Sequence, residues 1–125
     1  MKKIIFVIIT ICLSITLISC NKKKAVINLC CVDYSNVYDN YTGIDIIDEG
    51  CKFAQVEKWT IKCKVNDKIN VKVNVYEGYY IKTCYYNSAY TLDNASTLTV
   101  KNNSVEVKAL NTINYVIFDI VPNEA

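Results

Sequence analysis

Apolar and polar residues alternate with a period of two in the middle of the chain. The alternation is clearest over residues 59–65 (WTIKCKV) and 69–75 (INVKVNV), where the apolar side chains occupy odd-numbered positions. Because successive side chains of a strand point to opposite faces, this pattern predicts two strands that each bury one face. A three-residue turn around Asn66 and Asp67 keeps the odd positions of both strands on the same face, so we expect an antiparallel hairpin.

A third strand is expected after residues 76–78 (YEG), which suit a second three-residue turn. Gly78 occupies the position that needs a left-handed backbone, and the turn sets Val73 opposite Ile81. By this parity the odd positions, including Cys63, face the core, and the even positions lie on an outer face rich in lysine. The residues expected on that outer face are Tyr80, Tyr86, Cys84, Lys62, Lys64, Lys72 and Lys82.

A second set of three strands is expected near the C-terminus, over residues 98–100, 105–109 and 115–121. The apolar positions change from even to odd between the first two, so the turn between them has an even length. Asn102-Asn103 suits a two-residue type I′ turn because Asn tolerates positive φ, and Asn111-Thr112 can form the next turn in the same way. The expected opposite pairs are Val100 with Val105, Leu98 with Val107, Val107 with Val116 and Val105 with Phe118.

Two meanders with one apolar face each are expected to pack those faces together as a small β-sandwich. The predicted fold class is therefore all-β, immunoglobulin-like in architecture at most, since Cys51 lies only eight residues before Trp59. Residues 25–32 and 42–47 are expected to add edge strands. Residues 51–58 fit either a helical turn or a short strand.

The N-terminal pattern is different, because residues 4–18 carry no charge and follow Lys2 and Lys3. A positive start followed by a short apolar run is the layout of a secretory signal. A membrane-spanning helix needs about 20 apolar residues, so an uncleaved anchor is the less favoured alternative.

The apolar run ends in Leu17-Ile18-Ser19-Cys20, which resembles the lipobox of bacterial lipoproteins. The resemblance covers residues 1–24 and implies that the signal peptide is cut before Cys20 and that the Cys20 thiol carries a diacylglyceryl group. It also implies a location in the cell envelope, on the inner or the outer membrane, with the membrane itself as a partner. The expected organisation is a signal peptide at 1–19, a lipidated cysteine with a polar tether at 20–24, and one domain at 25–125.

An alternative is a secreted viral or eukaryotic immunoglobulin-like decoy that carries N-glycans. Three Asn-X-Ser/Thr triplets, at Asn40, Asn94 and Asn102, would be the acceptors. A chain rich in Asn, Ser and Thr contains such triplets by chance, so the lipoprotein interpretation is preferred.

Composition excludes several kinds of chemistry. The chain has no histidine and no arginine, and the part after residue 19 carries twelve lysines and twelve acidic residues. No nucleic-acid partner is expected, because Arg is the residue best suited to phosphate and base recognition. Without histidine, the usual acid/base pairs and the commonest metal ligand are missing. We therefore expect no enzyme, cofactor or metal site; the spacing of Asp39 and Asp45 matches no calcium loop.

Five cysteines follow Cys20, and none of them forms a C-x-x-C pair. In an exported protein disulfides are the favoured interpretation, and buried thiols that act as apolar residues are the alternative. If Cys30 and Cys31 lie in a strand, their thiols point to opposite faces. One of them could then meet Cys84 or Cys51.

Tyrosines are concentrated around the predicted third strand. Tyrosine supplies a large rigid contact area with a polar tip, as recognition surfaces use, although it is also an ordinary strand residue. The candidate binding surface for a protein or glycan partner consists of Tyr79, Tyr80, Tyr85, Tyr86 and Tyr90. The sequence thus favours an envelope lipoprotein with a binding, adhesion or structural module.

Overall fold

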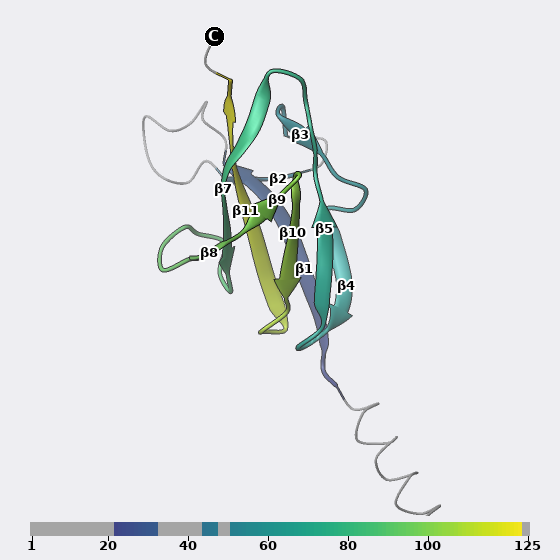
Figure 1. Cartoon of the computed structure of the whole chain (residues 1–125). Helices are drawn as coiled ribbons and strands as arrows, with labels where there is room; N and C mark the ends of the chain where they lie inside the picture. Colours follow the sequence, from purple (N-terminus) through teal and green to yellow (C-terminus); the bar gives the residue numbers. More distant parts are fainter. Residues whose placement is uncertain (1–21, 33–43, 48–50, 124–125) are drawn as a thin grey trace, which may run out of the picture.

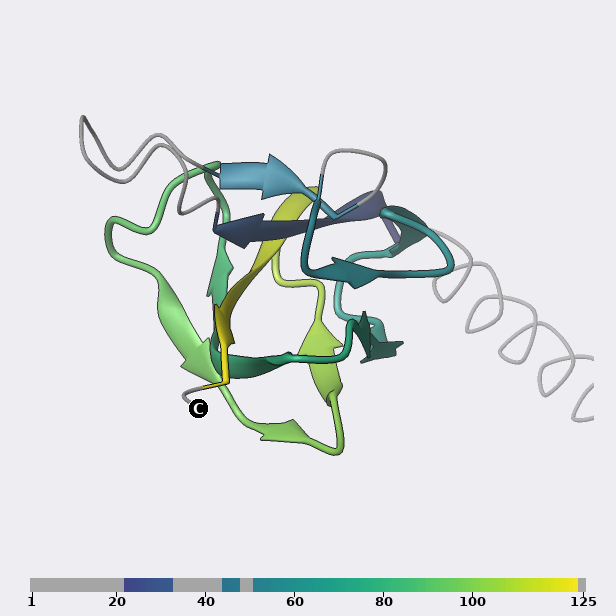
Figure 2. The same cartoon turned by 90° about the horizontal axis from the view of Figure 1, so that it is seen from above.

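The computed structural model of the protein describes residues 22–32, 44–47 and 51–123. These residues form eleven strands and no helix. The strands are β1 (Lys24–Val32), β2 (Ile44–Ile46), β3 (Ala54–Gln55), β4 (Thr60–Lys64), β5 (Lys68–Lys72), β6 (Asn74–Val75), β7 (Tyr79–Asn87), β8 (Ser96–Leu98), β9 (Val100–Lys101), β10 (Ser104–Lys108) and β11 (Ile113–Pro122). The predicted all-β sandwich is confirmed: the small sheet of β5, β10 and β9 packs over one face of a larger sheet (Figures 1 and 2).

The large sheet has the order β2-β1-β11-β7-β8, and β4 also pairs with β1. Its centre is a parallel pair, in which Leu29 of β1 lies opposite Val116 of β11. The other edge of β1 pairs with β4 along its first half and with β2 along its last residues. The prediction of an edge strand at residues 25–32 is therefore wrong. The largely apolar sequence of β1 is typical of an interior strand that is buried on both faces. The edge position predicted for 42–47 is confirmed by β2.

The small sheet contains the hairpin predicted at Asn102-Asn103. The two residues have φ of 50° and 58°, as a type I′ turn requires, and Val100 lies opposite Val105. The next predicted pair is wrong, because Leu98 lies opposite Cys84 of β7 in the large sheet. The chain changes sheets at Thr99, between β8 and β9.

The other predicted hairpins are corners that carry the chain between sheets. β4 belongs to the large sheet and β5 to the small one, and β10 and β11 are divided in the same way. The two corners are joined, because the Asn66 N–H donates to the Ala109 carbonyl at 2.6 Å and the Ala109 N–H donates to the Asp67 carbonyl at 2.9 Å. The expected pairing of Val107 with Val116 and of Val105 with Phe118 is therefore wrong; β10 pairs instead with β5.

The turn at residues 76–78 is also a change of partner. Gly78 has φ of +92°, which confirms the predicted left-handed position. However, β6 pairs with the short strand β3 and β7 pairs with β11 and β8, so the pairing of Val73 with Ile81 is wrong. Residues 51–58, for which the sequence fits either a helical turn or a short strand, contain the two-residue strand β3.

A bulge in β7 inverts the inside and outside positions of that strand. Asp119 lies opposite Thr83 and Ile120 lies opposite Ile81, so Lys82 has no partner in β11. Before the bulge the even residue Tyr80 is exposed, as predicted. After the bulge the even residues face inward, and the predictions that Cys84 and Tyr86 lie on the outer face are wrong.

The main core lies between the sheets, where Val71 of β5 and Val73, the residue after β5, belong to the same cluster as Phe118 and Ile120 of β11. The odd positions of β4 and β5 face it as predicted, and Cys63 is partly buried against it. A second cluster covers the outer face of the large sheet. It consists of Cys30, Ile117, Val32, Tyr85, Leu92 and Tyr115.

Candidate functional site

The five candidate tyrosines do not share one surface. Tyr80 and Tyr90 are each 45% exposed, and the ring of Tyr90 packs on Tyr115 with centroids 5.5 Å apart. Tyr79 is half-buried against Phe53, with ring centroids 5.1 Å apart. The remaining two, Tyr85 and Tyr86, lie on opposite faces of the large sheet, in the second cluster and in the main core.

Tyr86 belongs to a buried polar network centred on Asn114. Its hydroxyl donates to the Asn114 side-chain oxygen and accepts from the Leu110 backbone N–H at 3.2 Å. The Asn114 amide nitrogen donates to the carbonyls of Val26 at 3.0 Å and Asn111 at 2.7 Å. Asn114 is fully buried, so these bonds replace the water it loses and tie β11 to β1, β7 and the corner before it.

A groove lies on the outer side of the large sheet, at the end where β1 begins. It has a volume of about 750 Å³ and is lined mainly by β1, β4 and the start of β11. Lys24 lies directly opposite Lys64, and Val26 lies opposite Lys62 on one side and Ile113 on the other. We call Lys24, Val26, Lys62, Lys64 and Ile113 the lysine groove; its floor is apolar and its rim carries three exposed cations.

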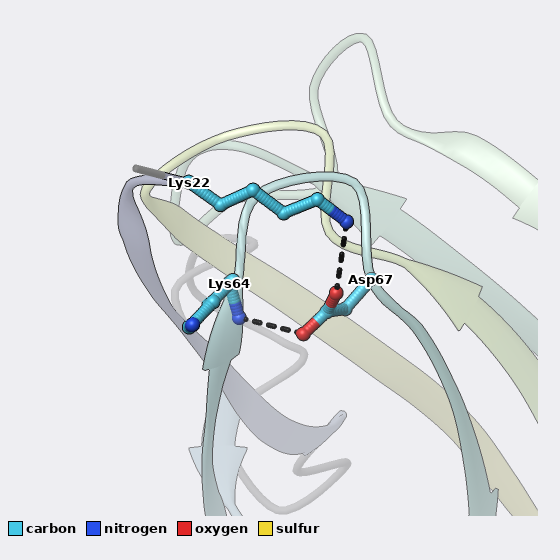
Figure 3. Close-up of polar contacts among 3 residues, drawn as sticks. All are labelled: Lys22, Lys64 and Asp67. Carbon is cyan, nitrogen blue, oxygen red and sulfur yellow. Dashed lines mark hydrogen bonds and ion pairs between the residues drawn. The ribbon is translucent and has the colours of Figure 1, made fainter. Parts of the chain in front are cut away.

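One carboxylate partly balances this positive charge. Asp67 Oδ1 lies 3.8 Å from Lys22 Nζ, and Asp67 Oδ2 accepts a hydrogen bond from the Lys64 backbone N–H at 3.0 Å (Figure 3). The ion pair is solvent-exposed, so its contribution to stability is small. Like charges directly opposite each other in a sheet are unfavourable, so the Lys24–Lys64 pair favours binding of an anion at this end.

The buried cysteines are not suited to nucleophilic chemistry. Burial raises the pKa of the Cys30 and Cys84 thiols to about 12. The pKa of Cys63 is also raised, mainly by burial and further by the nearby Asp67 carboxylate. Because the thiolate is the reactive form, these raised pKa values lower the reactivity of the three thiols at neutral pH. Within the described ranges, no three Cys, Asp or Glu residues are grouped as a metal site.

The other residues singled out in the sequence are only partly covered by the structure. Cys20, Asp39 and Asn40 fall outside the described residues, whereas Asp45 is placed in β2. Asn94 and Asn102 are exposed, in turns with positive φ. The lysine groove was missed in the sequence because nothing in the pattern of residues 25–32 reveals that β4 is its neighbour.

No family model, no curated protein and no solved structure matches this chain. No helix in the described part of the chain is long and apolar enough to span a bilayer.

Proposed function

We propose that this protein is a lipid-anchored lipoprotein of the bacterial cell envelope, whose β-sandwich is a binding or structural module held close to the membrane. The observation that carries the proposal is the motif Leu17-Ile18-Ser19-Cys20 at the end of an apolar, signal-like run. A diacylglyceryl group on Cys20, with a further acyl chain on the new N-terminus, holds a protein on a membrane because each buried methylene adds about 0.8 kcal/mol.

The start of the domain supports this arrangement. The Val65 N–H donates to the Lys23 carbonyl at 2.9 Å, and β1 begins at Lys24. Only a short stretch of chain therefore separates Cys20 from the sheet. The end of the sandwich that holds the lysine groove then lies next to the headgroups, where exposed lysines are attracted to anionic lipids.

We infer that a partner would bind to the exposed rings of Tyr80 and Tyr90. Both present a large flat area with a polar tip to solvent. Figure 1 places the start of β7, which carries Tyr80, away from the end where β1 begins. A protein or glycan partner could reach this ring while the protein stays on the membrane.

Metabolic labelling with a palmitate analogue in a bacterial host tests the anchor. The wild-type chain is expected to be labelled, to lose residues 1–19 and to have Cys20 as its N-terminus. Cys20→Ala should abolish the label, whereas Cys63→Ala, which changes a cysteine inside the domain, should retain it. Equal labelling of wild type and Cys20→Ala, or a mature N-terminus at Asn21, would contradict the proposal.

The secreted alternative rests on the exposure of Asn94 and Asn102. A glycan can be attached only where the Asn side chain is accessible, and both positions meet that condition. Expression in a eukaryotic secretory host tests whether these sites accept glycans. A mass decrease after glycosidase treatment that is reduced in Asn94→Gln and Asn102→Gln, together with an unlabelled Cys20 in the bacterial host of the palmitate experiment, would favour the secreted protein.

A further inference from the structure

The sulfurs of Cys31 and Cys51 lie 2.8 Å apart in the buried core. Sulfurs in a disulfide are separated by about 2.05 Å, so the bond needs them to approach by less than about 1 Å. We propose that Cys31 and Cys51 form a disulfide in the exported protein. This proposal rests on the export that the proposed function implies, and it does not depend on lipidation of Cys20.

The position of Cys31 in the sheet excludes the other pairing considered from the sequence. Cys31 lies opposite Phe118 on one side of β11, and Cys84 lies opposite the same Phe118 on the other side. Two strand spacings of about 4.8 Å separate the two cysteines, which exceeds the Cα separation of about 7 Å that a disulfide tolerates. Cys84 therefore cannot replace Cys51 as the partner of Cys31.

The neighbouring cysteine is excluded by the face it occupies. Cys30 belongs to the cluster on the outer face of the large sheet, and Cys31 belongs to the core between the sheets. The Cys30 thiol contacts the Asn28 carbonyl, with 3.8 Å between sulfur and oxygen. The pair is thus specific to Cys31 and Cys51, which share the main core.

The reaction needs a disulfide as its oxidant, either glutathione disulfide or the disulfide of a thiol oxidoreductase. Cys51 is 7% exposed and Cys31 is 1% exposed, so the Cys51 thiolate is the first to reach the oxidant. It attacks one sulfur of the oxidant, releases one thiolate and forms a mixed disulfide. The Cys31 thiolate then attacks Cys51 Sγ and releases the second thiolate. Two protons leave Cys31 and Cys51, and the oxidant is reduced to two thiols.

The bond would attach β1, the strand nearest the proposed anchor, to the segment that leads into β3. A crosslink between residues 20 positions apart restricts the unfolded chain and so favours the fold. It uses two of the five cysteines that follow Cys20 and leaves Cys30, Cys63 and Cys84 as thiols.

Differential alkylation of the full-length chain tests the proposal. The protein is isolated from the envelope and blocked with N-ethylmaleimide in denaturant, then reduced and labelled with iodoacetamide. Because no lysine lies between Lys24 and Lys52, trypsin leaves Cys30, Cys31 and Cys51 in one peptide. Cleavage before aspartate separates Cys31 from Cys51, since Asp33 to Asp48 lie between them. The same mapping is repeated on purified protein incubated with glutathione disulfide.

We expect the second reagent on Cys31 and Cys51 and the first reagent on Cys30, Cys63 and Cys84. Cys51→Ser should leave the first reagent on Cys31, whereas the matched control Cys30→Ser should keep the protected pair. If Cys51→Ser fails to fold, the wild-type map still decides the outcome. The proposal is overturned if Cys31 and Cys51 from the envelope both carry the first reagent, or if Cys31 is linked to another cysteine.

The result is independent of the anchor. A palmitate-labelled protein with both thiols reduced would overturn the disulfide and leave the lipoprotein proposal intact. A crosslinked protein without label on Cys20 would support the disulfide and contradict the lipoprotein proposal.

Discussion

The hydroxyl of Tyr86 joins three segments of the fold through Asn114, Leu110 and Asn111. Removal of the hydroxyl leaves the partly buried Leu110 N–H without its hydrogen-bond acceptor. Tyr86→Phe is therefore expected to lower the free energy of unfolding by about 1–2 kcal/mol. Urea denaturation followed by tryptophan fluorescence measures the change.

The matched control is Tyr80→Phe, which removes the same hydroxyl from an exposed ring of the same strand. Its denaturation midpoint should equal that of the wild type. Equal effects of the two substitutions would mean that the Asn114 network adds nothing to stability.

Asp119 gives the fold a dependence on pH. Its Oδ1 atom is buried without a hydrogen-bond partner among the described residues, and burial raises the pKa of this carboxyl. A raised pKa in the fold means that the charged form is less favourable there than in the unfolded chain. Below the ordinary carboxyl pKa, Asp119 is protonated in both states and burial of its charge costs nothing. As the pH rises from the ordinary pKa toward the raised pKa of the folded state, the fold loses stability.

Asp119→Asn should therefore raise the melting temperature at neutral pH and change it less at about pH 3, where the wild-type carboxyl is protonated. The exposed Asp93 serves as the control, because Asp93→Asn should leave the melting temperature unchanged both at neutral pH and in acid. A larger stabilisation by Asp119→Asn in acid than at neutral pH would contradict the assignment.

At the scale of elements, the sequence predicts which side chains are buried better than it predicts which strands pair. Odd residues of β4 and β5 face the core as expected, yet the two strands lie in different sheets. Parity cannot distinguish these arrangements, because strands that face each other across a core bury the same positions as strands in one sheet. Turns with a local cause, at Gly78 and Asn102-Asn103, were predictable because the required φ depends on the residue itself.

The bulge at Lys82 shows where parity fails. One extra residue in β7 moves Tyr86 from the expected outer face into the core, and no glycine or proline within the strand marks the position. Because of this bulge, Tyr86 is buried and does not belong to an exposed tyrosine surface. The lysine groove was not predictable at all, since it depends on the pairing of β1 with β4 and β11, which are distant in sequence.

The type I′ turn supplies a prediction at this scale. Asn103 has φ of 58°, which Gly adopts freely and Val does not. Asn103→Gly should leave the free energy of unfolding unchanged or slightly higher, and Asn103→Val should lower it by about 1 kcal/mol or more. Glu106→Val, at an exposed position of the same hairpin, is the control and should be neutral. Tolerance of valine at Asn103 would contradict the turn geometry.

At the scale of the whole molecule, the lysine groove and the proposed anchor together predict an orientation of the domain on a membrane. The double substitution Lys62→Glu and Lys64→Glu should weaken binding of residues 21–125 to vesicles that contain phosphatidylglycerol. Each lysine near an anionic surface contributes about 1 kcal/mol, so the loss should be at least about tenfold. Vesicle sedimentation at low salt measures it, and added salt should reduce the difference.

Lys82→Glu with Lys101→Glu makes the same change of charge outside the lysine groove and serves as the control. Binding should remain close to that of the wild type. An equal loss in both double variants would show that total charge, and not this end of the sandwich, determines binding.

The parallel pairing of β1 and β11 also determines how the protein would bear mechanical force. β1 starts at the end near the proposed anchor, and β11 runs beside it and finishes at Pro122, at the opposite end of the molecule (Figure 1). A pull between the membrane and the C-terminal end would slide the two strands along each other. All six opposed residue pairs, from Val26 with Ile113 to Cys31 with Phe118, would carry the load together. Hydrogen bonds loaded in this way break at once and not one after another, so β1, the strand next to the proposed anchor, is also the one that best resists extension.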